Sequence, residues 1–264
     1  AHRPGCLDAH RWGRLATLAS ALHSLANPLK AFGRDAEALE ALLDSERIMA
    51  GLAEARPDKY SADVEKVRGT LSDMLLRTGD AVGASRLSKT AYLGMKKLEE
   101  AFPGRYSSNL ATCAHQYGSV LRRLDDPRAA YPLLCESAAI REQLVGSREG
   151  ERERLARTLN EVAMCLLELD RPEEALSAVE RSIAEKSILA AGRPELALTL
   201  AGSLLTKAFV LAKLQREDSL RSVAEQIRQS VGTSTTLEAM SLLKAIADVE
   251  QSVVPARNSD LAKP

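Results

Sequence analysis

Residues 167–183 read LELDRPEEALSAVERSI, and the centre of this stretch ends one helix and begins another. Asp170 follows a leucine-rich run, and aspartate is a residue that favours turns and caps. Pro172 lies two positions later, where a first helical turn does not need the missing N–H. Glu173 and Glu174 then face the positive end of the new helix. The stretch is therefore predicted to be the hinge of a helical hairpin.

The same hinge occurs five times along the chain. Aligned on the turn residue, it reads GRDAEA at 33–38, GDAVGA at 79–84, DDPRAA at 125–130, DRPEEA at 170–175 and QREDSL at 215–220. The turn residues are 46, 46, 45 and 45 positions apart. A proline-containing segment at the end of the second helix recurs at the same spacing, as RPDKY at 56–60, FPGRY at 102–106 and GRPEL at 192–196. The third unit has GSREGE at this place instead. A period this regular indicates a repeat architecture.

Apolar residues recur every three or four positions on both sides of each hinge, which is the period of a helix and not of a strand. Leu159, Val162 and Leu166 show it before the fourth hinge, and Leu176 and Val179 show it afterwards. The predicted helices are 12–31 and 35–54, 61–77 and 81–100, 108–124 and 127–145, 151–169 and 172–190, and 195–214 and 217–231. Each unit is thus a pair of amphipathic helices.

Small residues occupy fixed places around each hinge. The position seven residues before it is taken by Ala26, Ser72, Gly118, Ala163 and Ala208. The start of the following helix is taken by Ala38, Ala84, Ala130 and Ala175, with Leu220 in the fifth unit. Small side chains allow the two helices of a hairpin to approach closely. We interpret both sets as packing positions without a catalytic role.

The fourth unit carries a resemblance to a known repeat family. In LNEVAMCLLELDRPEEAL, residues 159–176, the order of bulky, small and turn residues resembles the tetratricopeptide repeat. The units are longer than the usual repeat of about 34 residues, and they are similar to the extended repeats of kinesin light chain. The resemblance covers roughly 12–231, and the fifth unit departs from it at Lys207 and Leu220. It implies an all-α, right-handed α-α superhelix of five hairpins.

A further helix is expected to cap the last hairpin. After Gly232, Leu237, Met240, Leu243 and Ile246 are predicted to form its apolar stripe, and Thr235 with Glu238 fits a capping box. We expect a loose lead-in at 1–11, a repeat domain with its cap at 12–252 and a disordered tail at 253–264. The chain opens on AHRPGCLDAH without an initiator methionine, so we expect a processed chain or part of a longer one.

Composition and motifs disfavour several functional classes. Lys plus Arg and Asp plus Glu number 36 each, which disfavours a general nucleic-acid binder. The chain has no apolar run long enough for a membrane span, and its four scattered cysteines suggest a reducing, cytoplasmic location. No P-loop, GxGxxG, HExxH or GxSxG motif occurs, so we predict no enzyme, no cofactor and no metal site. His23 and His115 share a place in units one and three, which are not adjacent, so a shared metal is disfavoured.

Stacked repeats of this kind leave a concave face lined by the first helix of each hairpin. By the resemblance, groove positions lie thirteen, ten, six and three residues before each hinge. The candidate peptide-binding residues at these positions are Asn27, Lys30, Lys66, His115, Arg122, Arg157, Asn160, Met164 and Phe209. They combine cations and amides with an apolar C-terminal end. Solvated cations and apolar side chains packed against the next hairpin are the alternative interpretation of the same residues.

The resulting hypothesis is a protein-interaction scaffold whose concave groove binds a peptide or protein segment with acidic character. The alternative is a regulatory or sensor repeat domain of a larger protein, beside an ATPase, protease or transcriptional regulator. An enzyme is the third and weakest hypothesis, because no nucleophile, metal or phosphate signature is present. The sequence leaves the partner, the oligomeric state and the face used for binding open.

Overall fold

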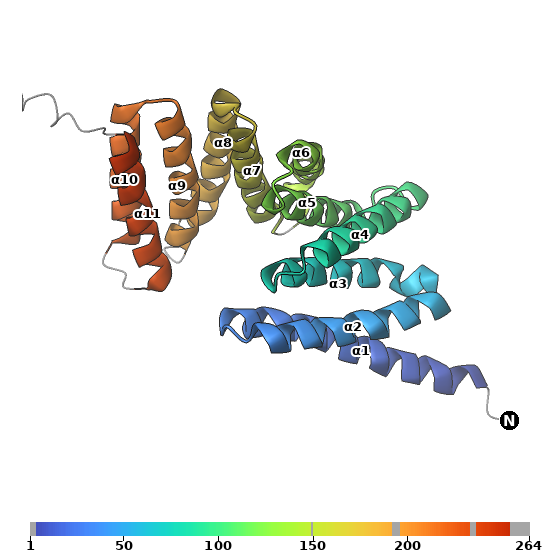
Figure 1. Ribbon diagram of the computed structural model, residues 1–264. Helices are drawn as coiled ribbons and strands as arrows, with labels where there is room; N and C mark the ends of the chain where they lie inside the picture. The colour runs from blue at the N-terminus through green and yellow to red at the C-terminus, as the bar shows by residue number, and fades with distance from the viewer. Residues whose placement is uncertain (1–3, 149, 192–195, 233–235, 254–264) are drawn as a thin grey trace, which may run out of the picture. The chain divides into compact units, whose positions relative to one another are not determined.

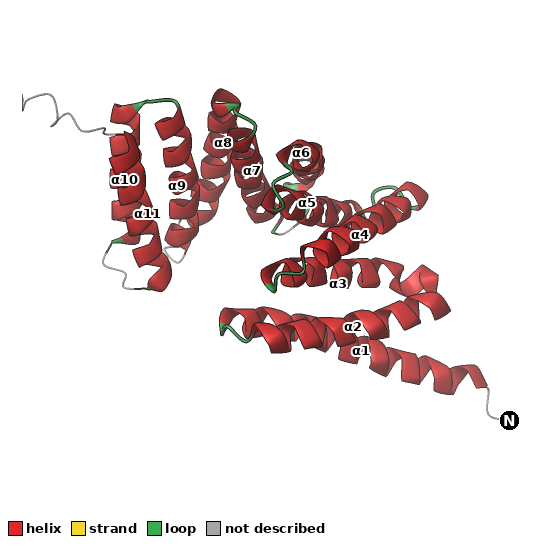
Figure 2. Cartoon of the chain, in the orientation of Figure 1, coloured by secondary structure: helices red, strands yellow, loops and turns green. Residues whose placement is uncertain are grey.

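The computed structural model describes residues 4–148, 150–191, 196–232 and 236–253, and in these residues all regular structure is helical (Figure 2). The helices follow one another as antiparallel pairs (Figure 1). The first pairs are α1 (Pro4–Ala31) with α2 (Asp35–Ala55), α3 (Pro57–Arg77) with α4 (Ala81–Ala101), and α5 (Ser107–Arg123) with α6 (Pro127–Leu144). The later ones are α7 (Glu151–Glu168) with α8 (Pro172–Ala190) and α9 (Ala197–Lys213) with α10 (Glu217–Val231), followed by α11 (Leu237–Val253). The all-α repeat architecture is confirmed.

The chain forms two compact units, Ala1–Ile140 and Arg141–Pro264. In the first unit, α2 packs against both α1 and α3, and α5 packs against α3 and α4. In the second unit, α9 packs against α7, α8 and α10, and α11 packs against α9 and α10. Within each unit, successive hairpins therefore pack against one another along the chain, as expected of a repeat protein.

All five predicted hinge residues have a left-handed backbone. The φ angles are +71° at Gly33, +94° at Gly79, +62° at Asp125, +57° at Asp170 and +55° at Gln215. The N–H that follows each hinge residue donates to the carbonyl of a leucine five residues earlier. These bonds join Arg34 to Leu29 at 2.9 Å, Asp80 to Leu75 at 2.8 Å, Asp126 to Leu121 at 3.0 Å, Arg171 to Leu166 at 2.9 Å and Arg216 to Leu211 at 3.0 Å. This is the Schellman arrangement, which satisfies the last carbonyls of the first helix and stops it.

The small residues lie where the two helices of a hairpin cross. Ala26, Ser72, Ala163 and Ala208 are 0% exposed, and Gly118 is buried. A Cβ atom on Gly118 would lie 2.8 Å from Cγ of Leu134 and 3.2 Å from the carbonyl of Ala130. The packing role predicted for these positions is therefore confirmed.

A buried serine adds a hydrogen bond to three of the hairpins. The hydroxyls of Ser45, Ser137 and Ser182 donate to the carbonyls of Ala19, Ala111 and Ala156 at 2.7, 2.6 and 2.7 Å. In each hairpin the donor and acceptor residues are 26 positions apart. The bond links the second helix to the first, and it satisfies a hydroxyl that would be costly to bury alone.

The segment between α6 and α7 lacks the proline found between the other hairpins, and a buried ion pair lies beside it. Arg141 and Glu151 are both 0% exposed, and Nη1 of Arg141 lies 2.8 Å from Oε2 of Glu151. Nη1 of Arg154 approaches Oε1 of Glu151 at 3.0 Å. Glu151 begins α7, where the helix dipole favours a carboxylate, whereas burial lowers the pKa of Arg141. Removing either partner would leave a buried charge uncompensated, which is strongly destabilising.

One boundary prediction needs correction. Helix α1 begins at Pro4, so residues 4–11 are helical and not a loose lead-in. Proline is well suited to that position because a first helical turn does not use its N–H. The predicted tail, 253–264, stays a prediction, because residues 254–264 lie outside the described residues; Val253 is the last residue of α11.

The capping helix is present, but its buried stripe is not the predicted one. Leu237 and Met240 are 85% and 60% exposed. The buried residues of α11 are Ala239, Leu242, Ile246 and Val249. Successive residues of the predicted stripe are always three positions apart, so the stripe drifts around the helix. The buried residues are alternately three and four positions apart, which keeps them on one side of the helix. Thr235 lies outside the described residues, and Thr236 accepts from the N–H of Ala239 at 3.2 Å.

The left-handed hinges lead to a stability prediction. Gln215→Gly should raise the unfolding free energy by roughly 0.5–1 kcal/mol, because a side chain disfavours positive φ and glycine does not. Gly79→Ala should lower it by about 1 kcal/mol or more for the opposite reason. A Cβ atom at Gly79 would meet nothing within 4 Å, so the effect there is one of backbone conformation. Denaturant melts followed by circular dichroism measure both changes, and a destabilised Gln215→Gly protein would contradict the assignment.

Candidate functional site

The first-helix face of the unit Ala1–Ile140 carries a chain of ion pairs. Nζ of Lys30 on α1 lies 2.9 Å from Oδ2 of Asp73 on α3. The other oxygen of the same carboxylate lies 3.1 Å from Nη1 of Arg123 on α5. Asp73 therefore joins three successive first helices. Lys30 was predicted to bind a ligand, and in the structure its charge is already balanced.

Two other candidates of this unit, Lys66 and His115, are also engaged or covered. Lys66 pairs with Asp63 at 3.1 Å. His115 is only 7% exposed and offers a ligand little surface. Arg122 is half-buried on α5, and Asn27 is exposed on α1. His23, which occupies the same place in its helix as His115, is bonded to Thr70 at 2.9 Å.

The unit Arg141–Pro264 differs, because its candidate cation is unpaired. Arg157 on α7 is exposed, and it forms no ion pair with any residue in the described parts of the chain. Its charge acts on two neighbouring cations, since it contributes to the lowered pKa values of Lys186 and Arg141, which burial lowers most. Arg157 therefore lies near two other cations, of which Arg141 is buried and paired with Glu151, while Glu153 acts on Lys186 with the opposite sign.

An amide and apolar side chains follow Arg157 along the same face. Asn160 is half-buried, and its Oδ1 atom has no hydrogen-bond partner. Met164 and Leu205 are half-buried, and Phe209 on α9 is 41% exposed. Met164 and Phe209 both lie six residues before their hinges, on helices that are in contact. Among the described residues, this part of the second unit brings together an exposed cation without an ion pair, a buried amide oxygen without a hydrogen-bond partner, and accessible apolar surface.

A buried carboxyl group in the first unit was missed by sequence analysis. Glu65 is 8% exposed and takes the place that Ala19, Ala111, Ala156 and Ala201 take in the other first helices, fourteen residues before the hinge. Glycine makes room for it, since a Cβ atom on Gly94 would lie 2.5 Å from Oε1 of Glu65. The repeat alignment contained this signal: it is the one charged residue among five aligned positions.

The environment of Glu65 favours its protonated form. Nη1 of Arg68 approaches Oε1 at 3.2 Å, while Oε2 has no partner. Burial raises the pKa of Glu65 to about 7, a shift that Arg68 opposes and Glu46 reinforces. Burial, with a contribution from Glu65, also raises the pKa of the nearby Cys113 thiol to about 12. Cys113 and Cys165 are buried and form no disulfide in the described part of the chain, and Cys135 is half-buried.

Glu65 makes a prediction for the pH dependence of stability. The folded-state pKa of Glu65, about 7, exceeds the ordinary value of 4.5. The protonated carboxyl group therefore stabilises the folded state fully below about pH 4.5, and this stabilisation is lost as the pH rises through about 7. Glu65→Gln imitates the protonated form. The variant should therefore gain stability relative to the parent between pH 5 and pH 8, by roughly 1–3 kcal/mol. Denaturant melts at both pH values measure this difference. The exposed Glu54→Gln serves as the control, and an equal effect of Glu65→Gln at both pH values would contradict the prediction.

None of the described helices is both long enough and apolar enough to cross a membrane. No family model and no curated protein matches the sequence. Solved structures do match. Aspartyl phosphate phosphatase F from Bacillus subtilis superposes with a TM-score of 0.66 at 12% identity, over 96% of this chain and 62% of that chain. TPR-like repeats of a putative kinesin light chain from Podospora anserina superpose with a TM-score of 0.60 at 18% identity, over 82% of this chain and 95% of that chain.

The chain has a tetratricopeptide-like repeat fold. A Rap protein complexed with Competence and Sporulation Factor matches as well, with a TM-score of 0.62 at 12% identity, over 88% of this chain and 63% of that chain. The resemblance to tetratricopeptide repeats, including those of kinesin light chains, is thus confirmed at the level of the fold. At these identities the likeness concerns the fold alone. Repeats of this fold typically mediate protein–protein interactions, whereas the binding residues of this chain stay a prediction.

Proposed function

We propose that this protein is an interaction scaffold, and that the first-helix face of α7 and α9 binds a segment of a partner protein with an acidic group and an apolar side chain. The observation that carries the proposal is which of the candidate cations already form ion pairs within the chain. Lys30 and Lys66 already pair with Asp73 and Asp63, whereas Arg157 is exposed and has no ion pair within the described parts of the chain. A carboxylate of a bound partner would therefore interact most favourably with Arg157.

The guanidinium group of Arg157 suits a carboxylate because two parallel N–H groups can donate to its two oxygens. Lys186 lies near enough for Arg157 to lower its pKa, and Nζ of Lys186 donates to the carbonyl of Thr199 at 2.7 Å. Both cations favour an acidic ligand over a basic one. Arg122 belongs to the first unit and remains a separate candidate.

Apolar surface beside Arg157 would supply the rest of the affinity. Phe209 is 41% exposed, and Met164 and Leu205 are half-buried. Buried apolar anchors usually account for much of the binding energy at an interface. Asn160 lies between Arg157 and Met164 along α7; its Oδ1 atom is buried, and its amide nitrogen is the group that can donate to a peptide carbonyl. A Rap protein with a similar fold is complexed with Competence and Sporulation Factor, so such a fold is compatible with holding a ligand.

The proposal predicts a graded loss of binding at position 157. Peptides selected from a displayed random library against the parent should be acidic, with an apolar residue nearby. Arg157→Glu should lower the affinity for the selected peptide by roughly 10- to 100-fold, because repulsion between carboxylates replaces a charge-assisted hydrogen bond. The peptide affinity of Arg157→Lys should fall between those of the parent and of Arg157→Glu. Added salt should reduce the affinity of the parent for the peptide. Calorimetry or fluorescence anisotropy measures these affinities.

The matched control is Arg181→Glu, a charge reversal on α8, the second helix of the same hairpin. Arg181 is 56% exposed and pairs with Glu142, so the substitution should leave peptide affinity within about twofold of the parent. Unchanged affinity in Arg157→Glu together with lost affinity in Arg181→Glu would move the binding site to the second helices. A library that yields only basic peptides would contradict the proposal altogether.

A further inference from the structure

Helix α4 carries an excess of positive charge that the other described second helices lack. It has four basic and two acidic residues, whereas α2 has one basic and six acidic residues. In α6 the two kinds are equal in number, and in α8 and α10 the acidic residues are more numerous. The chain as a whole has 36 residues of each sign. The charge of α4 is therefore a local departure from a balanced composition.

The basic residues of α4 lie in one row on the side of the helix that faces away from the core. At 3.6 residues per turn the row occupies an arc of about 100°, and two apolar residues lie among the cations. This α4 ridge consists of Val82, Arg86, Lys89, Leu93, Lys96 and Lys97. All six are exposed, with Val82 at 80% and Leu93 at 45%. The buried residues Ala84, Ala91 and Met95 lie on the opposite side of the helix.

Carboxylates of the protein balance little of the charge on the α4 ridge. The sequence contains no Asp or Glu between residues 81 and 98. Arg86, Lys89 and Lys97 form no ion pair with any residue in the described ranges. On α2, by contrast, Arg47 pairs with Asp44 at 2.7 Å. The ridge therefore presents positive charge that an anionic partner can reach.

Lys96 is the cation of the ridge with acidic groups nearby. Its Nζ atom lies 3.4 Å from the hydroxyl oxygen of Tyr92, and this hydroxyl group donates to Glu136 at 2.7 Å. The hydrogen bond to Tyr92 contributes most to the raised pKa of Lys96, and Glu136 and Glu100 add to it. Lys96 consequently keeps its positive charge at neutral pH. Glu100 is one turn beyond Lys96 and Lys97 and marks the end of the positive row.

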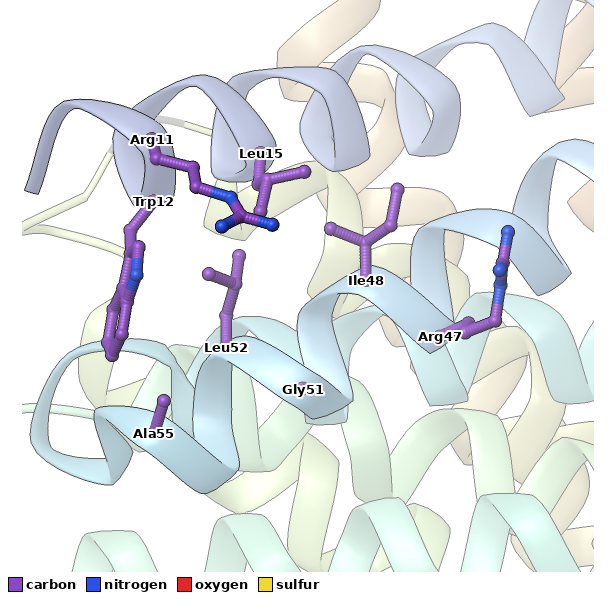
Figure 3. A pocket seen from close by; sticks show the side chains of 8 residues that line it. All are labelled: Arg11, Trp12, Leu15, Arg47, Ile48, Gly51, Leu52 and Ala55. Carbon is purple, nitrogen blue, oxygen red and sulfur yellow. The ribbon is translucent and has the colours of Figure 1, made fainter. Parts of the chain in front are cut away.

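A pocket in the same unit has no lining residue on α4. It measures about 430 Å³, lies between α1 and α2, and is lined by residues of those two helices alone. Figure 3 shows Leu15, Ile48 and Leu52 directed into the space between the two helices. A ligand that has to be enclosed by protein suits such a hollow. The α4 ridge is an outward-facing row of side chains, which suits a partner with an extended surface.

We propose that the α4 ridge binds the surface of an anionic lipid membrane, with α4 lying along that surface. Lipid phosphate groups contact the four cations, and Val82 and Leu93 reach the boundary between the headgroups and the acyl chains. A contact of this kind lies on the membrane and requires no spanning helix. The proposal is independent of Arg157, because it concerns the second hairpin only.

Two other anionic partners fit the ridge less well. A nucleic acid offers a row of phosphates, but contact through phosphates leaves Val82 and Leu93 in water. An acidic protein segment offers carboxylates and apolar side chains, but its anchoring side chains usually need pockets. A membrane interface supplies anionic groups and apolar surface in one plane, over the whole ridge length of about 22 Å.

Co-sedimentation of the whole chain with lipid vesicles tests the proposal. The vesicles contain phosphatidylcholine alone, or phosphatidylcholine and phosphatidylglycerol in equal amounts. The parent should bind the anionic vesicles and not the neutral ones, and added salt should weaken the binding. Each cation near an anionic surface contributes about fivefold to the affinity. The double variant Lys89→Glu with Lys97→Glu should therefore lower the partition coefficient by roughly 30-fold or more.

The matched control reverses two charges on other second helices, as Arg181→Glu with Arg221→Glu. These side chains on α8 and α10 are 56% and 63% exposed. The net charge of the chain changes by the same amount as in the first double variant. The partition coefficient of the control should nevertheless stay within about twofold of the parent, because exposed ion pairs contribute little to the fold. Circular dichroism should show that both double variants keep the parent's helicity and melting temperature.

Leu93→Ser distinguishes a membrane from other anions. It should lower the partition coefficient by roughly three- to tenfold, because less apolar surface leaves water on binding. A parent that ignores anionic vesicles, or binds neutral vesicles equally, would overturn the proposal. Equal losses in the two double variants would also overturn it. If the parent instead binds double-stranded DNA more tightly than vesicles, and Leu93→Ser changes neither affinity, the ridge binds nucleic acid and the membrane proposal is wrong.

Discussion

A single residue in the left-handed backbone conformation ends the first helix of each hairpin, and the rest of the structure depends on this constraint. Positive φ turns the chain, and the next N–H then donates to the leucine carbonyl five residues earlier. Because the turn is the same each time, the two helices leave it in the same relative register. The small residue seven positions before the hinge consequently lies at the helix crossing in every hairpin. Ser45, Ser137 and Ser182 reach the same carbonyl position for the same reason.

A common register also makes the exceptions informative. Glu65 occupies a position that is alanine in the other first helices, and Gly94 leaves the space that the larger side chain needs. The result is a carboxyl group whose charged form is disfavoured, in a place where the other hairpins have only packing. Helix α1 is an exception of another kind. Its Leu18 and Leu25 are about half exposed, whereas the leucine and valine at the same repeat positions of α3, Leu71 and Val64, are buried.

The polar residues of the first helices serve two different purposes. In the first unit, Lys30, Asp73 and Arg123 form ion pairs that connect successive hairpins, so they contribute to the relative placement of α1, α3 and α5. Such partly exposed pairs contribute little to stability individually, but they leave no free charge for a ligand. In the second unit, Arg157 has no such partner among the described residues. Polar side chains of the first helices therefore connect hairpins in the first unit, whereas Arg157 on the first helix α7 is an accessible charge in the second.

The sequence by itself determined the hinges, the helix pairs and the packing of small residues, because turn chemistry, helix period and side-chain size act over a few neighbouring residues. It could not determine which candidate cations are free, because Lys30 and Asp73 are 43 positions apart and meet only when two hairpins pack. It also gave the wrong stripe for α11, since α9 and α10 decide which side of that helix is buried. The burial of Glu65 and the exposure of Leu18 and Leu25 were likewise decided by the tertiary structure. The same kind of residue is buried or exposed according to whether another hairpin covers it, and that neighbour lies outside the reach of any local pattern.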